Sequence, residues 1–99
     1  MKDPLITPQA QADLEEAWLY VANGGEALAD QFLDKIHQLC RQLARFPGIG
    51  RDRSNLAANL RSFAVKPFVI FFRPADDTVE IIRILHGRRD IDTIFEEEP

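Results

Sequence analysis

The sequence predicts an α+β fold in which an N-terminal helical hairpin packs on one face of an antiparallel β-sheet. Two helical apolar stripes come first, three segments rich in β-branched and aromatic residues follow, and short turn sequences separate them. The expected order is β-α-α-β-β-β, with the last three strands forming a meander. A chain of 99 residues has the length of one domain, so we expect a single domain over 1–99.

The first half of the chain contains the predicted hairpin. Residues 5–6 form a short apolar segment that we expect to be an edge strand. Thr7-Pro8 has the pattern of a helix N-cap followed by proline at the first helical position, which predicts a helix over 8–22. The sequence Asn-Gly-Gly at 23–25 ends this helix.

A second helix is predicted over 26–46, because its apolar residues recur at spacings of three and four. Its acidic residues lie early and its arginines late, as the helix dipole favours. Pro47 and the glycines after it stop the helix, and the short connection makes the two helices antiparallel neighbours. The apolar stripe consists of Leu28, Phe32, Ile36, Leu39, Cys40, Leu43 and Phe46.

The second half reads as a loop over 51–59 followed by strands over 60–65, 68–73 and 78–85. Along the last strand, simple alternation would place residues 79, 81, 83 and 85 on one face and 80, 82, 84 and 86 on the other. The segment 89–95 has the composition of a short third helix.

Composition excludes several classes of protein. With 45% hydrophobic and 28% charged residues the chain is typical of a globular protein, and no apolar run reaches the roughly 18–20 residues of a membrane span. The start lacks a secretory signal, and the lone Cys40 fits a reducing cytoplasm, so we expect a cytoplasmic protein without a membrane partner. We expect no metal and no cofactor, because the two histidines, His37 and His86, have no ligand partners at suitable spacing.

The net charge of −4 is unevenly distributed. Residues 1–34 carry one Lys and seven acids, residues 35–89 carry eleven Lys or Arg and four acids, and residues 90–99 carry five acids. A basic middle framed by acidic ends fits an acidic partner, whether protein or nucleic acid, and it also fits an ordinary solvated surface.

The stretch ILHGRRDI at 84–91 holds the most suggestive polar residues. Arg88 and Arg89 follow Gly87, which turns the chain and should leave both arginines in solvent. Arg83 lies on an otherwise apolar strand, so it either pairs with an acid such as Asp90 or Glu80 or faces a partner.

Cleavage of RNA needs an acid–base pair besides a cation that stabilises the phosphorane. His86 is a candidate acid or base, but Glu80 lies six residues away, about 20 Å along a strand. The lone tyrosine, Tyr20, is on the first predicted helix. The residues alone therefore leave catalysis short of an acid–base pair.

Four stretches together resemble the ParE branch of the RelE/ParE superfamily of toxins from bacterial type II toxin–antitoxin systems: LITPQAQADLEEAWLYVA, LARFPGIGRDRSNL, LRSFAVKPFVIFFRP and VEIIRILHGRRDI. The resemblance covers nearly the whole chain. It implies the β-α-α-β-β-β fold and a growth-inhibiting toxin of a plasmid or chromosome, which a small antitoxin neutralises in a higher-order hetero-oligomer. ParE-like toxins are similar to inhibitors of DNA gyrase, whereas RelE-like toxins are ribosome-dependent messenger RNA endoribonucleases.

The resemblance and the charges together give three sets of candidate residues. We expect target binding by Arg83, His86, Arg88 and Arg89, and antitoxin binding by Arg61, Lys66 and Arg73. If the chain is a ribonuclease, its catalytic residues are Arg83, His86 and Arg89. Phe95 lies where the ribonucleases carry a tyrosine, which favours a non-enzymatic gyrase inhibitor. A third hypothesis is an interaction module without toxicity.

Overall fold

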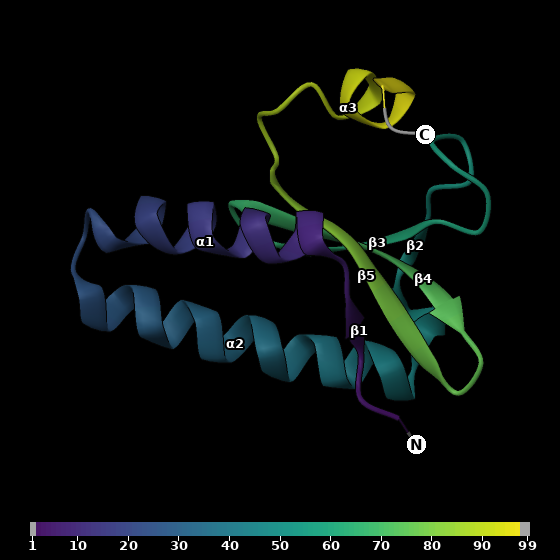
Figure 1. Cartoon of the computed structure of the whole chain (residues 1–99), viewed down its shortest axis with the longest axis horizontal. Helices are drawn as coiled ribbons and strands as arrows, with labels where there is room; N and C mark the ends of the chain where they lie inside the picture. Colours follow the sequence, from purple (N-terminus) through teal and green to yellow (C-terminus); the bar gives the residue numbers. More distant parts are fainter. Residues whose placement is uncertain (1, 98–99) are drawn as a thin grey trace.

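The predicted α+β fold is confirmed, with a sheet of five strands and the helical hairpin on one of its faces (Figure 1). The computed structural model describes residues 2–97. The strand order is β1-β5-β4-β3-β2. The elements are β1 (Leu5–Ile6), α1 (Pro8–Ala22), α2 (Glu26–Arg45), the 3-10 helix η1 (Pro47–Ile49), β2 (Arg51–Asp52), β3 (Arg61–Val65), β4 (Phe68–Ala75), β5 (Thr78–His86) and α3 (Ile91–Glu97).

The helical hairpin forms as predicted, with small differences at its ends. The Thr7 hydroxyl caps α1 by accepting a hydrogen bond from the Ala10 amide at 3.0 Å, and Pro8 is the first helical residue. Gly25 precedes α2 with a φ of 125°, a conformation that glycine adopts without strain. Helix α2 ends at Arg45, one residue earlier than expected, because Pro47 opens η1 directly afterwards.

The sheet is mixed rather than purely antiparallel. β1 pairs in parallel with β5, with Leu5 opposite Glu80 and Ile6 opposite Ile81. The β3, β4 and β5 strands form the expected meander. β1 was predicted as an edge strand, and it is one, but it closes the sheet beside the last strand of the chain.

Other boundaries differ where the local sequence gives little signal. The expected loop over 51–59 begins with β2, whose two polar residues pair with Arg61 and Ser62 but are too few to show alternation. β3 starts one residue later than predicted, and β4 continues through Pro74 to Ala75. Helix α3 starts at Ile91 instead of residue 89, because the Asp90 carboxylate accepts hydrogen bonds from the amide and hydroxyl of Thr93 and so caps the helix.

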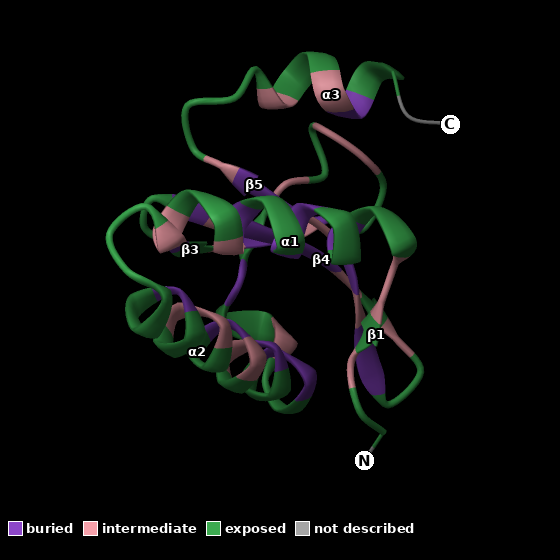
Figure 2. Cartoon of the chain, turned by 60° about the vertical axis from the view of Figure 1, so that its left-hand side comes forward, coloured by how far each residue is buried: buried purple, intermediate pink, exposed green. Residues whose placement is uncertain are grey.

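Apolar side chains pack on both faces of the sheet. The larger core joins the hairpin to one face through residues such as Leu14, Ile36 and Phe72. On the other face, Leu60, Phe71, Leu85 and Phe95 form a smaller core under α3 and the segment that follows β2. Figure 2 shows the buried residues on the strands and on the inner sides of the helices, whereas the outer sides of α1 and α2 are exposed. The prediction covered only the first of these faces.

Simple alternation along β5 was a wrong expectation. The register between β4 and β5 shifts at Phe71/Phe72, where Ile81 pairs with Phe72 and Arg83 with Phe71, so Ile82 is an extra residue on β5. As a result, Ile84 joins Ile81 in the core beneath the hairpin, and Leu85 joins the opposite core. The bulge therefore exchanges the faces of the residues that follow it.

Gly50 tests the packing of the hairpin core. A Cβ at this position would overlap the Phe72 ring, with Cε1 only 2.7 Å away. We expect Gly50→Ala to lower the free energy of unfolding by about 1–3 kcal/mol, because the fully buried Phe72 ring has no free space into which it can move away from the added methyl group. Urea denaturation measures the change.

Gly48→Ala is the matched control, since nothing lies within 4 Å of a Cβ at Gly48. This control should stay within about 0.5 kcal/mol of the parent chain. Equal unfolding free energies for the two alanine variants would contradict the packing at Gly50.

Candidate functional site

Arg83 forms an internal ion pair with Asp13 of α1. Its Nε and Nη2 donate to the two Asp13 carboxylate oxygens at 2.7 and 3.0 Å, and the Ile84 amide donates to the same carboxylate at 2.9 Å. The side chains of Arg83 and Asp13 are only 14% and 6% exposed. The sequence reasoning named Asp90 and Glu80 as partners, but Asp90 caps α3 and Glu80 lies 4.0 Å from Arg73. Arg83 therefore attaches α1 to β5, and its guanidinium contacts Asp13 within the fold.

The turn after β5 presents Arg88 and Arg89 in solvent, as predicted. The Arg88 amide donates to His86 Nδ1 at 3.1 Å, and the Arg89 amide donates to the His86 carbonyl at 3.0 Å. The Gly87 amide donates to the Pro67 carbonyl at 2.8 Å. These bonds fix the turn and hold it against the turn between β3 and β4.

Lys66 precedes Pro67 in that neighbouring turn and is exposed. It was assigned to the antitoxin set, yet the structure places it at the same end of the sheet as Arg88 and Arg89. We call these three residues the cationic tip. Within residues 2–97, none of the three has a carboxylate at ion-pair distance, so their charges are available to a partner.

Three rings pack edge to face beside the cationic tip. The Tyr20 and His86 ring centroids are 5.4 Å apart, and Phe68 lies 5.8 Å from Tyr20 and 5.3 Å from His86. A small hollow of about 140 Å³ opens here between α1 and the strand ends, with Glu16 and Arg89 among its lining residues. Sequence reasoning missed Tyr20, because only the packing of α1 on β5 brings it to His86.

Glu80, the β5 carboxylate considered as an acid–base partner of His86, lies away from it, whereas Glu16 and Tyr20 of α1 line the hollow beside His86. Glu80 sits opposite Leu5 and beside Arg73, at the far end of β5 from His86. Phe95 is a core residue whose ring centroid lies 5.0 Å from that of Phe71. The C-terminal aromatic residue therefore serves packing and is not turned toward a partner.

The remaining members of the antitoxin set brace a different part of the fold. Arg61 donates to the carbonyl oxygens of Gly48 and Gly50, and the Arg73 Nε donates to the Ala58 carbonyl at 3.1 Å. Both side chains hold the segment between α2 and β3 onto the sheet. The predicted trio of Arg61, Lys66 and Arg73 therefore does not gather into one surface.

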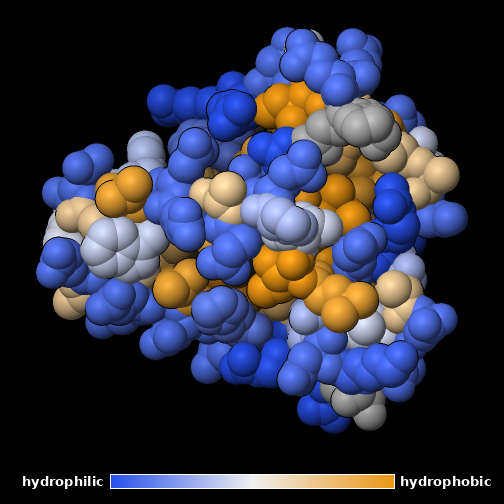
Figure 3. All heavy atoms as spheres, in the orientation of Figure 1, coloured by the Kyte–Doolittle hydropathy of each residue, from blue (hydrophilic) through white to orange (hydrophobic). Residues whose placement is uncertain are grey.

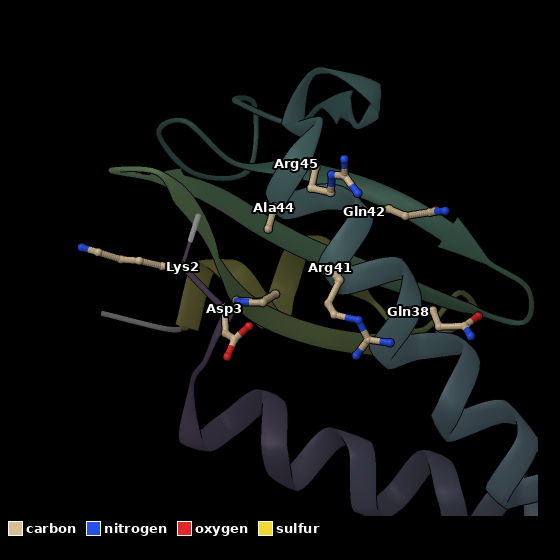
Figure 4. A pocket seen from close by; sticks show the side chains of 8 residues that line it. Lys2, Asp3, Gln38, Arg41, Gln42, Ala44 and Arg45 are labelled. Carbon is tan, nitrogen blue, oxygen red and sulfur yellow. The ribbon is translucent and has the colours of Figure 1, made fainter.

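Two larger hollows border the hairpin. One of about 400 Å³ separates the N-terminal segment from α2, and Figure 4 shows Arg41 and Arg45 extending from successive turns of that helix. The other, of about 320 Å³, is apolar and includes Leu14, Trp18 and Leu33 of α1 and α2. In Figure 3, apolar side chains show between the helices and below α3, among a mostly hydrophilic face.

Metal ligands do not cluster in the part of the chain that the structure describes. Cys40 is buried in the hairpin core, as expected, and burial raises the pKa of its thiol to about 11. No helix within residues 2–97 is long and apolar enough to span a bilayer.

Comparison with known proteins identifies the family. The model of the family described as the ParE toxin of the type II toxin–antitoxin system parDE matches residues 5–91. The chain belongs to the ParE toxin family. This places it in the ParE branch of the RelE/ParE superfamily, as the sequence motifs indicated.

Individual relatives of this ParE-family chain agree. It is 37% identical to toxin ParE3 of Caulobacter vibrioides over 86 residues, which cover 86% of each chain. It is 31% identical to toxin ParE1 of Mycobacterium tuberculosis over 90 residues, covering 89% of this chain and 92% of the relative. A chain in a structure titled as the chromosomal ParDE system of P. aeruginosa has the same fold, with a TM-score of 0.72 and 22% identity over 87% of this chain and 96% of that chain.

Removal of the Asp13 carboxylate should destabilise the fold. We expect Asp13→Ala to lower the free energy of unfolding by about 3 kcal/mol, because it removes the largely buried carboxylate that the Arg83 guanidinium and the Ile84 amide both contact. It should also speed amide hydrogen exchange at Ile84, whose N–H donates to Asp13. Urea denaturation and NMR hydrogen exchange measure the two effects. Glu16→Ala, at an exposed position of the same helix, is the control. An equally small loss of unfolding free energy in both variants would contradict the role of the Asp13–Arg83 pair in holding α1 to β5.

Cys40 should react slowly with iodoacetamide at pH 8 in the folded chain. A thiol pKa of about 11 instead of 9.0 leaves far less thiolate, so we expect alkylation slower by on the order of 100-fold than in the same chain unfolded in urea. Mass spectrometry over time follows the modification. Comparable rates in both states would contradict burial of this thiol.

Proposed function

We propose that this ParE-family chain inhibits DNA gyrase by binding to it, and that a cognate antitoxin neutralises the chain by covering the binding surface. The family gives the coarse function, a toxin of a type II system. The cationic tip with His86 beside it supports the finer proposal. A rigid turn that holds unpaired cations outward suits binding to an acidic surface.

Binding accounts for the site better than catalysis does. Glu80 lies at the other end of β5 and Phe95 is buried against Phe71, so neither is beside His86. Tyr20 and Glu16 line the hollow at His86 instead, and inhibition by binding requires no proton transfer from either. Inhibition by binding needs only a fixed surface of the right charge. We therefore propose a target surface of Arg88, Arg89, His86 and Lys66, and we leave Arg83 out of it because its guanidinium pairs with Asp13.

The same charges give the antitoxin a place to bind. An acidic, amphipathic antitoxin segment would neutralise the tip with its charged face. The antitoxin and the target would then compete for one surface of the toxin. This arrangement explains neutralisation without any change in the toxin fold.

The proposal is tested by inhibition of gyrase supercoiling with purified protein. We expect the double variant Arg88→Ala, Arg89→Ala to require at least about tenfold more protein for half-inhibition, since a factor of ten corresponds to only about 1.4 kcal/mol of lost binding. The circular dichroism spectrum and the unfolding midpoint should stay unchanged, because both side chains are exposed.

Arg41→Ala with Arg45→Ala is the matched control, because it removes the same charge from exposed positions on α2. This control should inhibit supercoiling like the parent chain. Undiminished inhibition by the tip variant would contradict the proposed surface. Cleavage of messenger RNA in purified translation, with supercoiling unaffected, would establish the ribonuclease instead, and normal growth during expression without antitoxin would indicate a non-toxic interaction module.

A further inference from the structure

We propose that the cationic tip, made of Lys66, Arg88 and Arg89, binds the phosphodiester backbone of DNA. The inference deepens the proposed function and rests on it, because the DNA contact would matter in the complex with gyrase. It assigns the chemistry of the partner: a row of phosphates rather than an acidic protein surface. It also assigns a role to Lys66, which the sequence separates from the two arginines and the fold brings to them.

The arrangement of the tip is fixed before any partner binds. The hydrogen bond from the Gly87 amide to the Pro67 carbonyl joins the two turns at 2.8 Å. The amides of Arg88 and Arg89 are held by His86 on the other side. Because the backbone is already ordered, binding does not have to order the two turns in addition to the three side chains.

The three side chains have the chemistry that phosphates require. A guanidinium donates two parallel hydrogen bonds to a phosphate, and a lysine ammonium adds a mobile point charge. Within residues 2–97 none of them is neutralised by a neighbouring carboxylate, so none must first lose an internal partner. Arg83 differs, because Asp13 already occupies its guanidinium.

Aromatic rings lie beside the cations. The Tyr20 ring is 54% exposed and packs edge to face against His86 in the same corner of the molecule. Exposed rings next to cations are a common surface for the sugars and bases that accompany phosphates.

The net negative charge of the whole chain confines any contact with DNA to a local basic region. With a net charge of −4, the protein has no general attraction to a polyanion, so DNA must approach through a confined basic region. Duplex DNA offers one negative charge per roughly 1.7 Å of its axis, and therefore presents several phosphates along the two joined turns that carry the cations. An acidic protein surface would need carboxylates placed to match the trio.

Fluorescence anisotropy of a short labelled DNA duplex tests the inference with the full chain and no gyrase present. We expect salt-dependent binding with a dissociation constant between about 10⁻⁶ and 10⁻⁴ M, as is usual for non-specific contacts. The slope of log K against log salt should be roughly −3, because each neutralised phosphate contributes about −0.9. The triple variant Lys66→Ala, Arg88→Ala, Arg89→Ala should lose binding.

Lys66→Ala alone provides the sharper test, since Lys66 is exposed in a turn and its loss should not affect folding. It should make the salt slope shallower by about 0.9, the value for a single phosphate contact. Arg41→Ala with Arg45→Ala, the pair visible in Figure 4, should leave both the affinity and the slope unchanged. A control variant that weakens binding as much as the triple variant would overturn the assignment to the tip.

The outcomes separate this inference from the proposed function. If the chain inhibits gyrase but does not bind DNA, the inference is wrong. Binding to gyrase alone that needs Lys66, Arg88 and Arg89 would then show that the tip recognises an acidic protein surface. If the chain binds DNA through the tip but leaves gyrase active, the inference stands and the proposed target fails.

Discussion

The rest of the structure depends on the hydrogen bonds between the Asp13 carboxylate of α1 and the open edge of β5. β1 pairs with β5 at only two positions, so the strand would otherwise end with unpaired backbone groups. Helix α1 completes the edge with side chains: the Thr7 hydroxyl donates to the Ile82 carbonyl at 3.0 Å, and Asp13 accepts from the Ile84 amide. One helix thus replaces the missing part of a strand.

The same carboxylate neutralises Arg83, the charged residue in the otherwise apolar second half of β5. Arg83 lies between Ile82 and Ile84, and its burial without a partner would be costly. With both guanidinium contacts and one amide on Asp13, the carboxylate is well coordinated and the charges cancel. Such a pair adds little net stability compared with apolar residues, but it admits one register of α1 against β5. That register is what carries Tyr20 to His86.

The sequence predicts the parts of this fold that depend on local patterns. The stripe on α2, the Thr7-Pro8 start of α1 and the β-branched run of β5 determine their elements almost to the residue. Long-range pairings leave no such pattern. The parallel contact of β1 and the partner of Arg83 depend on segments 70 or more residues apart, and the bulge at Ile82 depends on how β5 pairs with β4. At the candidate site, the exposure of Arg88 and Arg89 follows from Gly87, whereas the addition of Lys66 and Tyr20 requires the tertiary fold.

The smaller core under α3, on the face of the sheet opposite the hairpin, affects how the chain is degraded. Helix α3 has seven residues and packs on this core through Phe95, Ile91 and Ile94, so few apolar contacts oppose its local opening. Its opening would expose Phe71 and Leu85 to proteases while the hairpin core stays folded. The connection between the Gly87 and Pro67 turns lies before α3 and does not depend on it. Degradation could therefore begin at the C-terminus of a molecule whose basic surface is still intact.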